Sequence, residues 1–505
     1  MKLRDCTHGD LAFNTTACIM PAEISISVFK KEEPMARQPR KRSGSRTPDV
    51  TDGRTSPPAE DRTGEIQPEM TGPGTTGRFL VLLREDADAG AAMLSRVSGL
   101  RVASAADFEA GAAPEDLGGA DAVVLPELGI CVVDAQPDQI RALGASVEDT
   151  GVLAIEPERV VYAIQDGPAV QTGLLGSVPE SGTASISLEY LRGYRDAVNH
   201  LYDKLTGTEA GEVAAEAAPA FSETELTWGL QATKVPGSRF TGRGIRVAVL
   251  DTGLDLDHPD LTGRRITAQS FIEGQQVQDG HGHGTHCIGT ACGPRRPGIL
   301  PRYGVAYEAE IFAGKVLSNQ GSGGDGGILA GIQWAITNGC AIVSMSLGAP
   351  VQAGQPFSQV FEQAARRALA RGTLIIAAAG NESQRPQRIA PVGHPANCPS
   401  IMAIGAVDRR MRIAFFSCGG LNPQGGQVDL AGPGVDIRSS WPRPTLYNKI
   451  SGTSMATPHA AGIAALWAES DASFRGRSLM SMLIQSARRL PLMARDVGAG
   501  LVQAP

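Results

Sequence analysis

The sequence has no run of 18 apolar residues, so it predicts no membrane-spanning helix. Positive charge is not in excess: 46 Lys and Arg residues face 53 Asp and Glu residues, which argues against a nucleic-acid-binding protein. Aromatic residues make up only 5%, whereas 61 glycines favour a fold with many tight turns. The 505 residues, of which 42% are hydrophobic, suffice for two or three folded units with a sizeable core.

Paired cysteine spacings such as C-x-x-C are also missing. We therefore expect reduced, buried thiols, with a disulfide framework as the alternative. A secretory signal is not recognised either, because Asn14, Pro21 and Glu23 interrupt the apolar residues between 11 and 29. Translation from Met35 or Met70 would not supply such a signal.

Composition divides the chain into four parts. Residues 30–78 contain no Phe, Trp or Tyr and are rich in Pro, Gly, Ser, Thr and Arg, so we expect residues 1–77 to be a disordered tail. Residues 78–165 alternate apolar strand patterns with two short helical patterns, which predicts a small α+β domain. Residues 166–221 are expected to be a connector with one helix, and residues 222–505 form the largest domain. The α+β domain has expected strands at 79–83, 121–134 and 152–164 and expected helices at 88–98 and 137–143.

The region 222–505 predicts an α/β fold with a doubly wound, mostly parallel sheet, because short apolar runs alternate with helical patterns. Functional sites in such sheets gather at the carboxyl ends of the strands. The expected strands are 245–250, 310–317, 341–347, 373–380 and 401–407, and the expected helices include 328–338 and 357–371.

Asp251 directly follows the apolar run 245–250 in the sequence A-V-L-D-T-G, which is a favourable position for a functional carboxylate. A second D-T-G begins at Asp149 and raises the alternative of an aspartic protease, which needs two carboxylates that share a proton. Asp149 follows no apolar strand, so we expect it to be a turn residue.

Three histidines cluster in D-G-H-G-H-G-T-H-C, at positions 281, 283 and 286. Together with Cys287 they could bind zinc, but the carboxylate base of H-E-x-x-H is missing. Alternatively, one of them is the general base of a nucleophilic triad. Gly282 and Gly284 would then allow a substrate backbone to come close.

Ser454 lies in S-G-T-S-M-A-T-P-H-A-A-G, where a turn leads into a helix of small residues. The positive end of that helix and its free N–H groups could stabilise a developing oxyanion. Asn381 ends the apolar run 374–380 and is a candidate second donor.

Residues 222–505 resemble the subtilisin-like serine proteases (subtilases), because they contain Asp251, His283, Asn381 and Ser454 in the order typical of that family. The motifs that carry the resemblance are D-T-G, H-G-T-H, S-L-G, A-A-A-G-N and G-T-S-M-A-T-P-H. The resemblance implies that Ser454 is the nucleophile, His283 the general base and Asp251 the residue that orients it. Asn381 and the Ser454 N–H would form the oxyanion hole. Cys287 resembles the proteinase K-like pattern, which implies a thiol beneath His283.

The resemblance also implies two strands that pair with an extended peptide and a pocket for the P1 side chain. The walls of this P1 pocket would be residues 346–349, 378–380 and 392–393. We expect the pocket to bind a bulky apolar P1 side chain, although Glu382 at its rim could admit a basic one. The implied substrate-binding residues are Gly321, Ser322, Gly323, Ser346, Leu347, Gly348, Ala379, Gly380 and Gly393.

The segment V-L-A-I-E-P-E-R-V-V resembles the end of the family's inhibitory propeptide. The α+β domain at 78–165, which we expect to be ferredoxin-like, therefore resembles that propeptide. The resemblance thus implies a zymogen that needs no cofactor for its chemistry. Pro399, Ile401 and Asp429 match a calcium site of the family, made of two carbonyls and a carboxylate. Asp260 matches another calcium ligand, although Arg295 and Arg296 in its expected loop disfavour a cation.

Polypeptides are the expected substrates and the propeptide the expected intramolecular inhibitor of a monomer that binds neither membrane nor nucleic acid. Two other functions remain open: a metal or aspartic hydrolase, and a peptide-binding scaffold without activity. The family indicates an extracellular protein, whereas the unpaired thiols and missing signal indicate a cytoplasmic one.

Overall fold

The structure, a computed structural model, describes residues 74–84, 87–105, 119–144, 151–164 and 220–505. The expected tail, the helix of the connector and Asp149 lie outside these residues. We call residues 74–164 the N-terminal module and residues 220–505 the C-terminal module. In the described part of the chain, no helix has both the length and the apolar character required to cross a bilayer.

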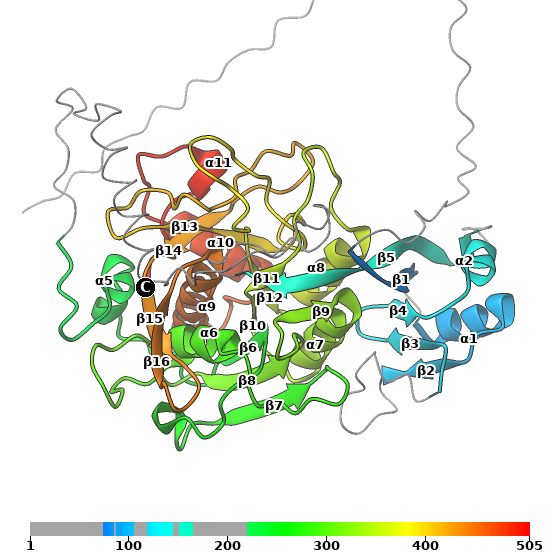
Figure 1. Ribbon diagram of the computed structural model, residues 1–505, viewed down its shortest axis with the longest axis horizontal. Helices are drawn as coiled ribbons and strands as arrows, with labels where there is room; N and C mark the ends of the chain where they lie inside the picture. The colour runs from blue at the N-terminus through cyan, green and yellow to red at the C-terminus, as the bar shows by residue number, and fades with distance from the viewer. Residues whose placement is uncertain (1–73, 85–86, 106–118, 145–150, 165–219) are drawn as a thin grey trace, which may run out of the picture. The chain divides into compact units, whose positions relative to one another are not determined.

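A seven-stranded sheet forms the centre of the C-terminal module, and all its neighbouring strands are parallel (Figure 1). Except for one edge strand, its strands are largely buried on both faces, which is why most of them appear in the sequence as continuous apolar runs. Its spatial order is β14 (Leu430–Pro433), β13 (Met402–Val407), β12 (Leu374–Ala378), β10 (Ile342–Met345), β6 (Arg246–Asp251), β8 (Glu310–Lys315) and β7 (Ile266–Ser270).

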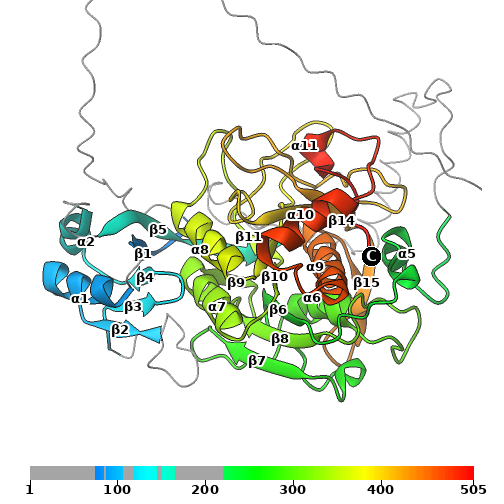
Figure 2. The ribbon, with the colours of Figure 1, turned by 180° about the vertical axis from the view of Figure 1, so that it is seen from behind.

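Helices cover both faces of this sheet, as the front and back views show (Figures 1 and 2). Val247 and Val249 of β6 join the core beneath α6 (His283–Cys292), α9 (Thr453–Ser470) and α10 (Gly476–Ser486). Ala248 and Leu250 join the opposite core beneath α7 (Asp325–Thr337) and α8 (Gln359–Ala370). The expected doubly wound α/β fold is therefore confirmed.

Local sequence explains where α8 begins and ends. Ser358 is its N-cap, with a side chain that accepts a hydrogen bond from Phe361 N. The chain leaves the helix at Gly372, whose φ of +86° favours glycine. Between these residues the helix is amphipathic and buries Val360 and Phe361.

The N-terminal module has the strand order β5-β1-β4-β3-β2 with two helices, the split βαβ arrangement of a ferredoxin-like fold. One face of its sheet, including Phe79 and Val81, packs with Leu94 and Ile140 from the helices. The other face joins the core of α7 and α8. Its elements are β1 (Thr75–Leu83), α1 (Ala87–Ser98), β2 (Val102–Ser104), β3 (Ala122–Leu125), β4 (Ile130–Val133), α2 (Pro137–Gly144) and β5 (Val152–Ala163).

Strand β5 joins the two modules. Its last residues pair antiparallel with β9 (Ser322–Gly324) on one side and β11 (Leu347–Gly348) on the other, so β5 lies between two strands of the C-terminal module (Figure 1). Earlier in the same strand, the Glu156 carboxylate accepts hydrogen bonds from Ser358 Oγ and Gln359 N at the start of α8, both at 2.6 Å. Glu158 accepts one from Gly326 N, at 2.7 Å, at the start of α7.

Several elements were not predicted from the sequence. Strands β7 and β14 are absent from the predicted set, and the predicted run 341–347 is divided into β10 and β11. The unpredicted helices include α6. The remaining elements are α5 (Trp228–Ala232), η2 (Val235–Gly237), η3 (Pro259–Leu261), the hairpin β15 (Ile437–Ser440) and β16 (Tyr447–Ile450), and α11 (Ala494–Val497).

Candidate active site

Asp251 and His283 form a buried hydrogen-bonded pair. Asp251 is the last residue of β6 and His283 the first of α6, and the distance from Asp251 Oδ1 to His283 Nδ1 is 2.7 Å. Thr252 N also donates to Asp251 Oδ1, at 2.7 Å, and so fixes the carboxylate. Burial opposes a charge on His283, but the Asp251 carboxylate and the neighbouring Cys287 together outweigh it and hold the pKa of the imidazole well above its usual range.

Ser454 lies in the first turn of α9, which packs beside α6. Its hydroxyl donates to the carbonyl oxygens of Ile164, at 2.5 Å, and Ser346, at 3.1 Å. It makes no hydrogen bond with His283, and His283 Nε2 is buried without a partner among the described residues. The Cys287 thiol lies between the two residues, 3.9 Å from His283 Nδ1 and 3.6 Å from the Ser454 carbonyl oxygen.

The side-chain amide of Asn381 is held by its oxygen. Asn381 Oδ1 accepts hydrogen bonds from Thr453 N, at 3.0 Å, and Thr453 Oγ1, at 2.9 Å. Its Nδ2 is buried and lacks a partner in the described part of the chain. A Cβ atom built on Gly452 would lie 3.0 Å from this Nδ2, 3.1 Å from the Ile164 carbonyl oxygen and 3.6 Å from Ser454 N. The two N–H groups and the carbonyl oxygen of Ile164 thus lie around the same point beside Gly452.

The residues expected to bind substrate surround the end of β5. Ala163 N donates to Gly321 O at 2.8 Å, and Ile164 N to Ser346 O at 3.3 Å. Tyr162 lies opposite Ser322 and Gly348 in the two ladders. The residues brought together here are Gly321, Ser322, Gly323, Ser346, Leu347 and Gly348.

The Ile164 side chain is buried against the expected P1 wall, since a Cβ atom on Gly348 would lie 3.1 Å from Ile164 Cδ1. Gly393 donates its N–H to Ala379 O at 2.9 Å, and a Cβ on Gly393 would meet Ala349 O at 2.9 Å. A side chain at position 393 would therefore collide with the backbone of Ala349, which explains why a glycine is found there. The Glu382 carboxylate accepts from the Cys418 thiol at 3.1 Å and lies beside Gly380.

The three histidines of the cluster do not converge as a ligand set. His286 Nε2 donates to Ile437 O at 2.9 Å, and burial lowers the pKa of His286 to about 3. Among the described residues, Asp251, His283 and Cys287 have potential ligand atoms within 4.8 Å of one another. The Nδ1 atom that His283 would offer to a metal is the one already bonded to Asp251. These contacts favour the alternative in which His283 is a general base.

The expected role of Gly282 and Gly284 in admitting a substrate is wrong. A Cβ on Gly282 would lie 2.4 Å from the Trp441 ring, and one on Gly284 would lie 2.3 Å from the carbonyl oxygen of Gly253. Both glycines therefore allow close packing inside the protein. Sequence analysis also missed Thr252 and Thr453, although both directly adjoin a candidate catalytic residue.

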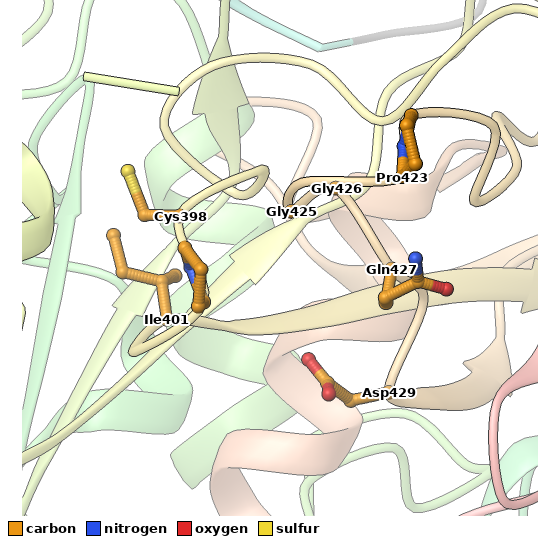
Figure 3. A pocket seen from close by; sticks show the side chains of 8 residues that line it. Cys398, Ile401, Pro423, Gly425, Gly426, Gln427 and Asp429 are labelled. Atoms are coloured by element: carbon orange, nitrogen blue, oxygen red, sulfur yellow. The ribbon is translucent and has the colours of Figure 1, made fainter. Parts of the chain in front are cut away.

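A cavity of about 220 Å³ lies at the expected calcium site formed by Pro399, Ile401 and Asp429. Its other lining residues are Cys398, Pro423, Gly425, Gly426 and Gln427. Figure 3 shows the Asp429 carboxylate pointing toward the side of the cavity on which Ile401 lies. One carboxylate oxygen accepts from Ala403 N at 2.7 Å, and burial raises the pKa of Asp429 to about 6. A partly buried carboxylate that lines a cavity is a fitting group for a cation such as Ca²⁺.

Asp260 has a different environment. Its Oδ2 accepts from Tyr303 Oη at 2.6 Å and Tyr447 Oη at 3.0 Å, and its Oδ1 accepts from Gly298 N at 2.7 Å. Three protein donors thus satisfy this carboxylate. The six described cysteines are all buried and free, as expected from their spacing.

Comparison with known proteins identifies the family. Residues 242–500 match the model of the subtilase family. The chain is 38% identical to subtilisin Savinase of Lederbergia lenta over 284 residues, which cover 55% of this chain and 97% of that protein. It is 39% identical to alkaline elastase YaB of Bacillus sp. (strain YaB), over 55% of this chain and 69% of that protein. It is 40% identical to subtilisin E of Bacillus subtilis (strain 168), over 48% of this chain and 60% of that protein. The chain belongs to the subtilase family and is a serine-type endopeptidase.

Proposed function

We propose that Ser454, His283 and Asp251 form the catalytic triad and that the chain is made as a zymogen. Ser454 Oγ attacks the carbonyl carbon of the scissile bond while His283 Nε2 takes the hydroxyl proton and later gives it to the leaving amine. Asp251 keeps the imidazole in the required tautomer through the 2.7 Å bond to Nδ1. The unpaired Nε2 of His283 is available for the proton. A rotation of the Ser454 side chain away from its two carbonyl acceptors would begin the reaction.

Asn381 Nδ2 and Ser454 N would stabilise the oxyanion. Both lie close to Gly452 together with the Ile164 carbonyl oxygen, and Asn381 Nδ2 has no hydrogen-bond partner among the described residues. Thr453 holds Asn381 by its oxygen, so that the N–H group is oriented in advance of the reaction. Every step in this scheme uses groups of the protein, and none requires a cofactor.

Strand β5 would be the chain's own first substrate. The Ile164 carbonyl is the group beside the nucleophile, so the bond cut in maturation would be Ile164–Gln165. The same strand would then remain in the cleft as a product inhibitor, held by the ladders with β9 and β11. The domain expected at 78–165 is thus proposed as the inhibitory propeptide, with its end at Ile164, and residues 222–505 are proposed as the catalytic domain.

The N-terminal module would also assist folding. Glu156 and Glu158 supply acceptors to the first turns of α8 and α7, where N–H groups lack partners within the helix. The apolar face of the module sheet, including Leu80 and Val132, is buried with the same two helices. Binding of the module would therefore stabilise both helices before the molecule is cut.

The side chains of β5 indicate the substrates. Ile164 would occupy the P1 pocket and Val161, which is fully buried, the P4 pocket, whereas Tyr162 at P3 is 50% exposed. We propose that the enzyme prefers polypeptides with apolar residues at P1 and P4. A basic P1 residue, the alternative, is disfavoured because Glu382 is turned toward Cys418.

We further propose Ca²⁺ as a structural ligand of the cavity lined by Pro399, Ile401 and Asp429. Two backbone carbonyls and the carboxylate would supply oxygen ligands, and the cation would offset the cost of burying Asp429. Its contribution would be to stability.

One observation carries the proposed function: the Ser454 hydroxyl and the unpaired Asn381 amide both face the carbonyl group at the end of an extended, antiparallel-paired strand. Replacement of Ser454 by Ala tests it. We expect the Ser454→Ala chain to keep its fold and to lose both casein hydrolysis and the cut after Ile164. Undiminished hydrolysis would contradict the proposal.

A further inference from the structure

Lys315, the last residue of β8, has a fully buried side chain and an ammonium group that takes part in no ion pair among the described residues. Burying a charge that is in no direct ion pair costs folding free energy, so a buried lysine of this kind is expected to have a function that offsets the cost. Its Nζ donates to Thr252 O at 2.5 Å and to Asn319 Oδ1 at 2.9 Å. In the sheet, Lys315 lies directly opposite Asp251.

Both acceptors lead to the proposed catalytic residues. Thr252 N donates to Asp251 Oδ1 at 2.7 Å, and Thr252 Oγ1 accepts from Gly284 N at 2.8 Å, next to His283. Asn319 Oδ1 also accepts from Gly280 N at 3.1 Å, in the loop that precedes His283. The ammonium group therefore ties the turn after Asp251 to the loop before His283.

We propose that Lys315 is a positioning residue of the catalytic pair: its two hydrogen bonds fix Asp251 and His283 relative to each other, and its charge disfavours a second positive charge on His283. The inference rests on the triad of the proposed function. Lys315 would touch neither the substrate nor the reacting atoms. It would act through Thr252 and Asn319.

The charges around the ammonium group agree with this role. Burial lowers the pKa of Lys315, while the Asp279 and Asp251 carboxylates oppose that shift. Asp279 accepts hydrogen bonds from Thr252 Oγ1, at 2.9 Å, and His281 N, at 2.9 Å, so it belongs to the same network. The further titratable groups here are His281, whose pKa is lowered first by burial and then by His283, and the Cys287 thiol, which lies 3.9 Å from His283 Nδ1. Lys315 thus adds a permanent positive charge to a cluster of two carboxylates and two histidines.

The test compares Lys315→Met with the parent full-length chain, using a fluorogenic peptide amide with the β5 sequence V-Y-A-I and rates measured from about pH 5 to about pH 10. We expect plateau kcat to fall about tenfold to a hundredfold because the pair is misplaced, with KM within about twofold. The acid limb of kcat/KM should move up by about half a pH unit, since loss of a nearby positive charge favours the protonated imidazole. Lys315→Arg keeps the charge and should return the limb to its parent position.

A purely structural lysine would lower the melting temperature without moving the acid limb. An unmoved limb, a plateau within about twofold of the parent, or a change confined to KM would overturn the proposal. The triad itself is tested separately by Ser454→Ala, so the two failures are distinguishable.

Two substitutions at exposed positions decide the question if Lys315→Met does not fold. Asn319→Asp would place a carboxylate against the ammonium and partly neutralise it, so the acid limb should again rise by about half a pH unit. Gln320→Glu adds the same charge one residue further along, at an exposed position with no contact to Lys315. If the acid limb of kcat/KM lay at the same pH in these two variants, the proposal would be overturned.

Discussion

The Ser454 hydroxyl donates a hydrogen bond to the carbonyl oxygen of Ile164 at 2.5 Å, although 290 residues separate the two in the chain. Ile164 directly follows the strand that pairs on both sides with the C-terminal module. The nucleophile of the proposed triad therefore faces a carbonyl group of its own chain, at the position that a scissile bond would occupy.

Replacement of Ile164 by Asp should slow the cut that follows it by about a hundredfold or more, because a charged side chain would be buried in an apolar pocket. Tyr162→Ala is the matched control, since the Tyr162 side chain is half exposed and its loss should change the rate by less than about threefold. Intact-mass measurements over time give both rates. Equal slowing by the two substitutions would argue against Ile164 as the P1 residue.

Glu158→Gln should destabilise the uncut chain. Glu158 is fully buried and binds Arg78 at 2.7 Å as well as Gly326 N, so removal of its charge weakens a largely buried ion pair and the hydrogen bond at the start of α7. We expect a loss of about 3 kcal/mol in the free energy of unfolding, measured by urea titration in the Ser454→Ala background.

Glu127→Gln provides the comparison for Glu158. Glu127 pairs with Arg371, the residue that directly follows α8, and both side chains are more than a third exposed. Its replacement should change the unfolding free energy by no more than about 1 kcal/mol. If the two variants had the same free energy of unfolding, the contacts of Glu158 would contribute no more to stability than the exposed Glu127 ion pair does.

Asn381→Leu should reduce kcat by about 10²–10³ and leave KM nearly unchanged, because the amide would act on the transition state; this magnitude is known from subtilisin and was not calculated from the present distances. Steady-state kinetics on an apolar-P1 peptide measures both constants. A rise in KM with an unaltered kcat would place Asn381 in ground-state binding instead.

Calcium should stabilise the protein more at pH 8 than at pH 5. Burial raises the pKa of Asp429 to about 6, above its ordinary value, so the neutral carboxyl group is favoured below that pH and the anion that a cation needs forms as the pH rises through it. Melting temperatures with calcium and with a chelator give the comparison. Asp429→Asn should abolish the difference at both pH values, whereas Asp257→Asn, at an exposed position, should preserve it.

The sequence predicted the strands that are continuous apolar runs and the helices that have an apolar stripe on one face. Strands such as β6 and β12 are continuous apolar runs, and α8 has a clear amphipathic period with a cap at each end. The edge strand β7 is only half buried, and β14 contains Gly and Pro, so neither shows the pattern. Every residue of α6 is buried, which removes the helical period from its sequence.

The motifs brought Asp251 and His283 into one hypothesis because their order and spacing are typical of a family. They could not predict which group the serine hydroxyl contacts, since this depends on the position of β5 in the cleft. Nor could they predict that Gly282 packs against Trp441, because that contact joins segments about 160 residues apart.

The mass of the chain after incubation tests the central claim most directly. We predict that the parent protein yields two fragments that end at Ile164 and begin at Gln165, while the Ser454→Ala variant stays intact under the same conditions. A Ser454→Ala chain that is cut after Ile164 at the parent rate, with contaminating protease removed, would contradict the account.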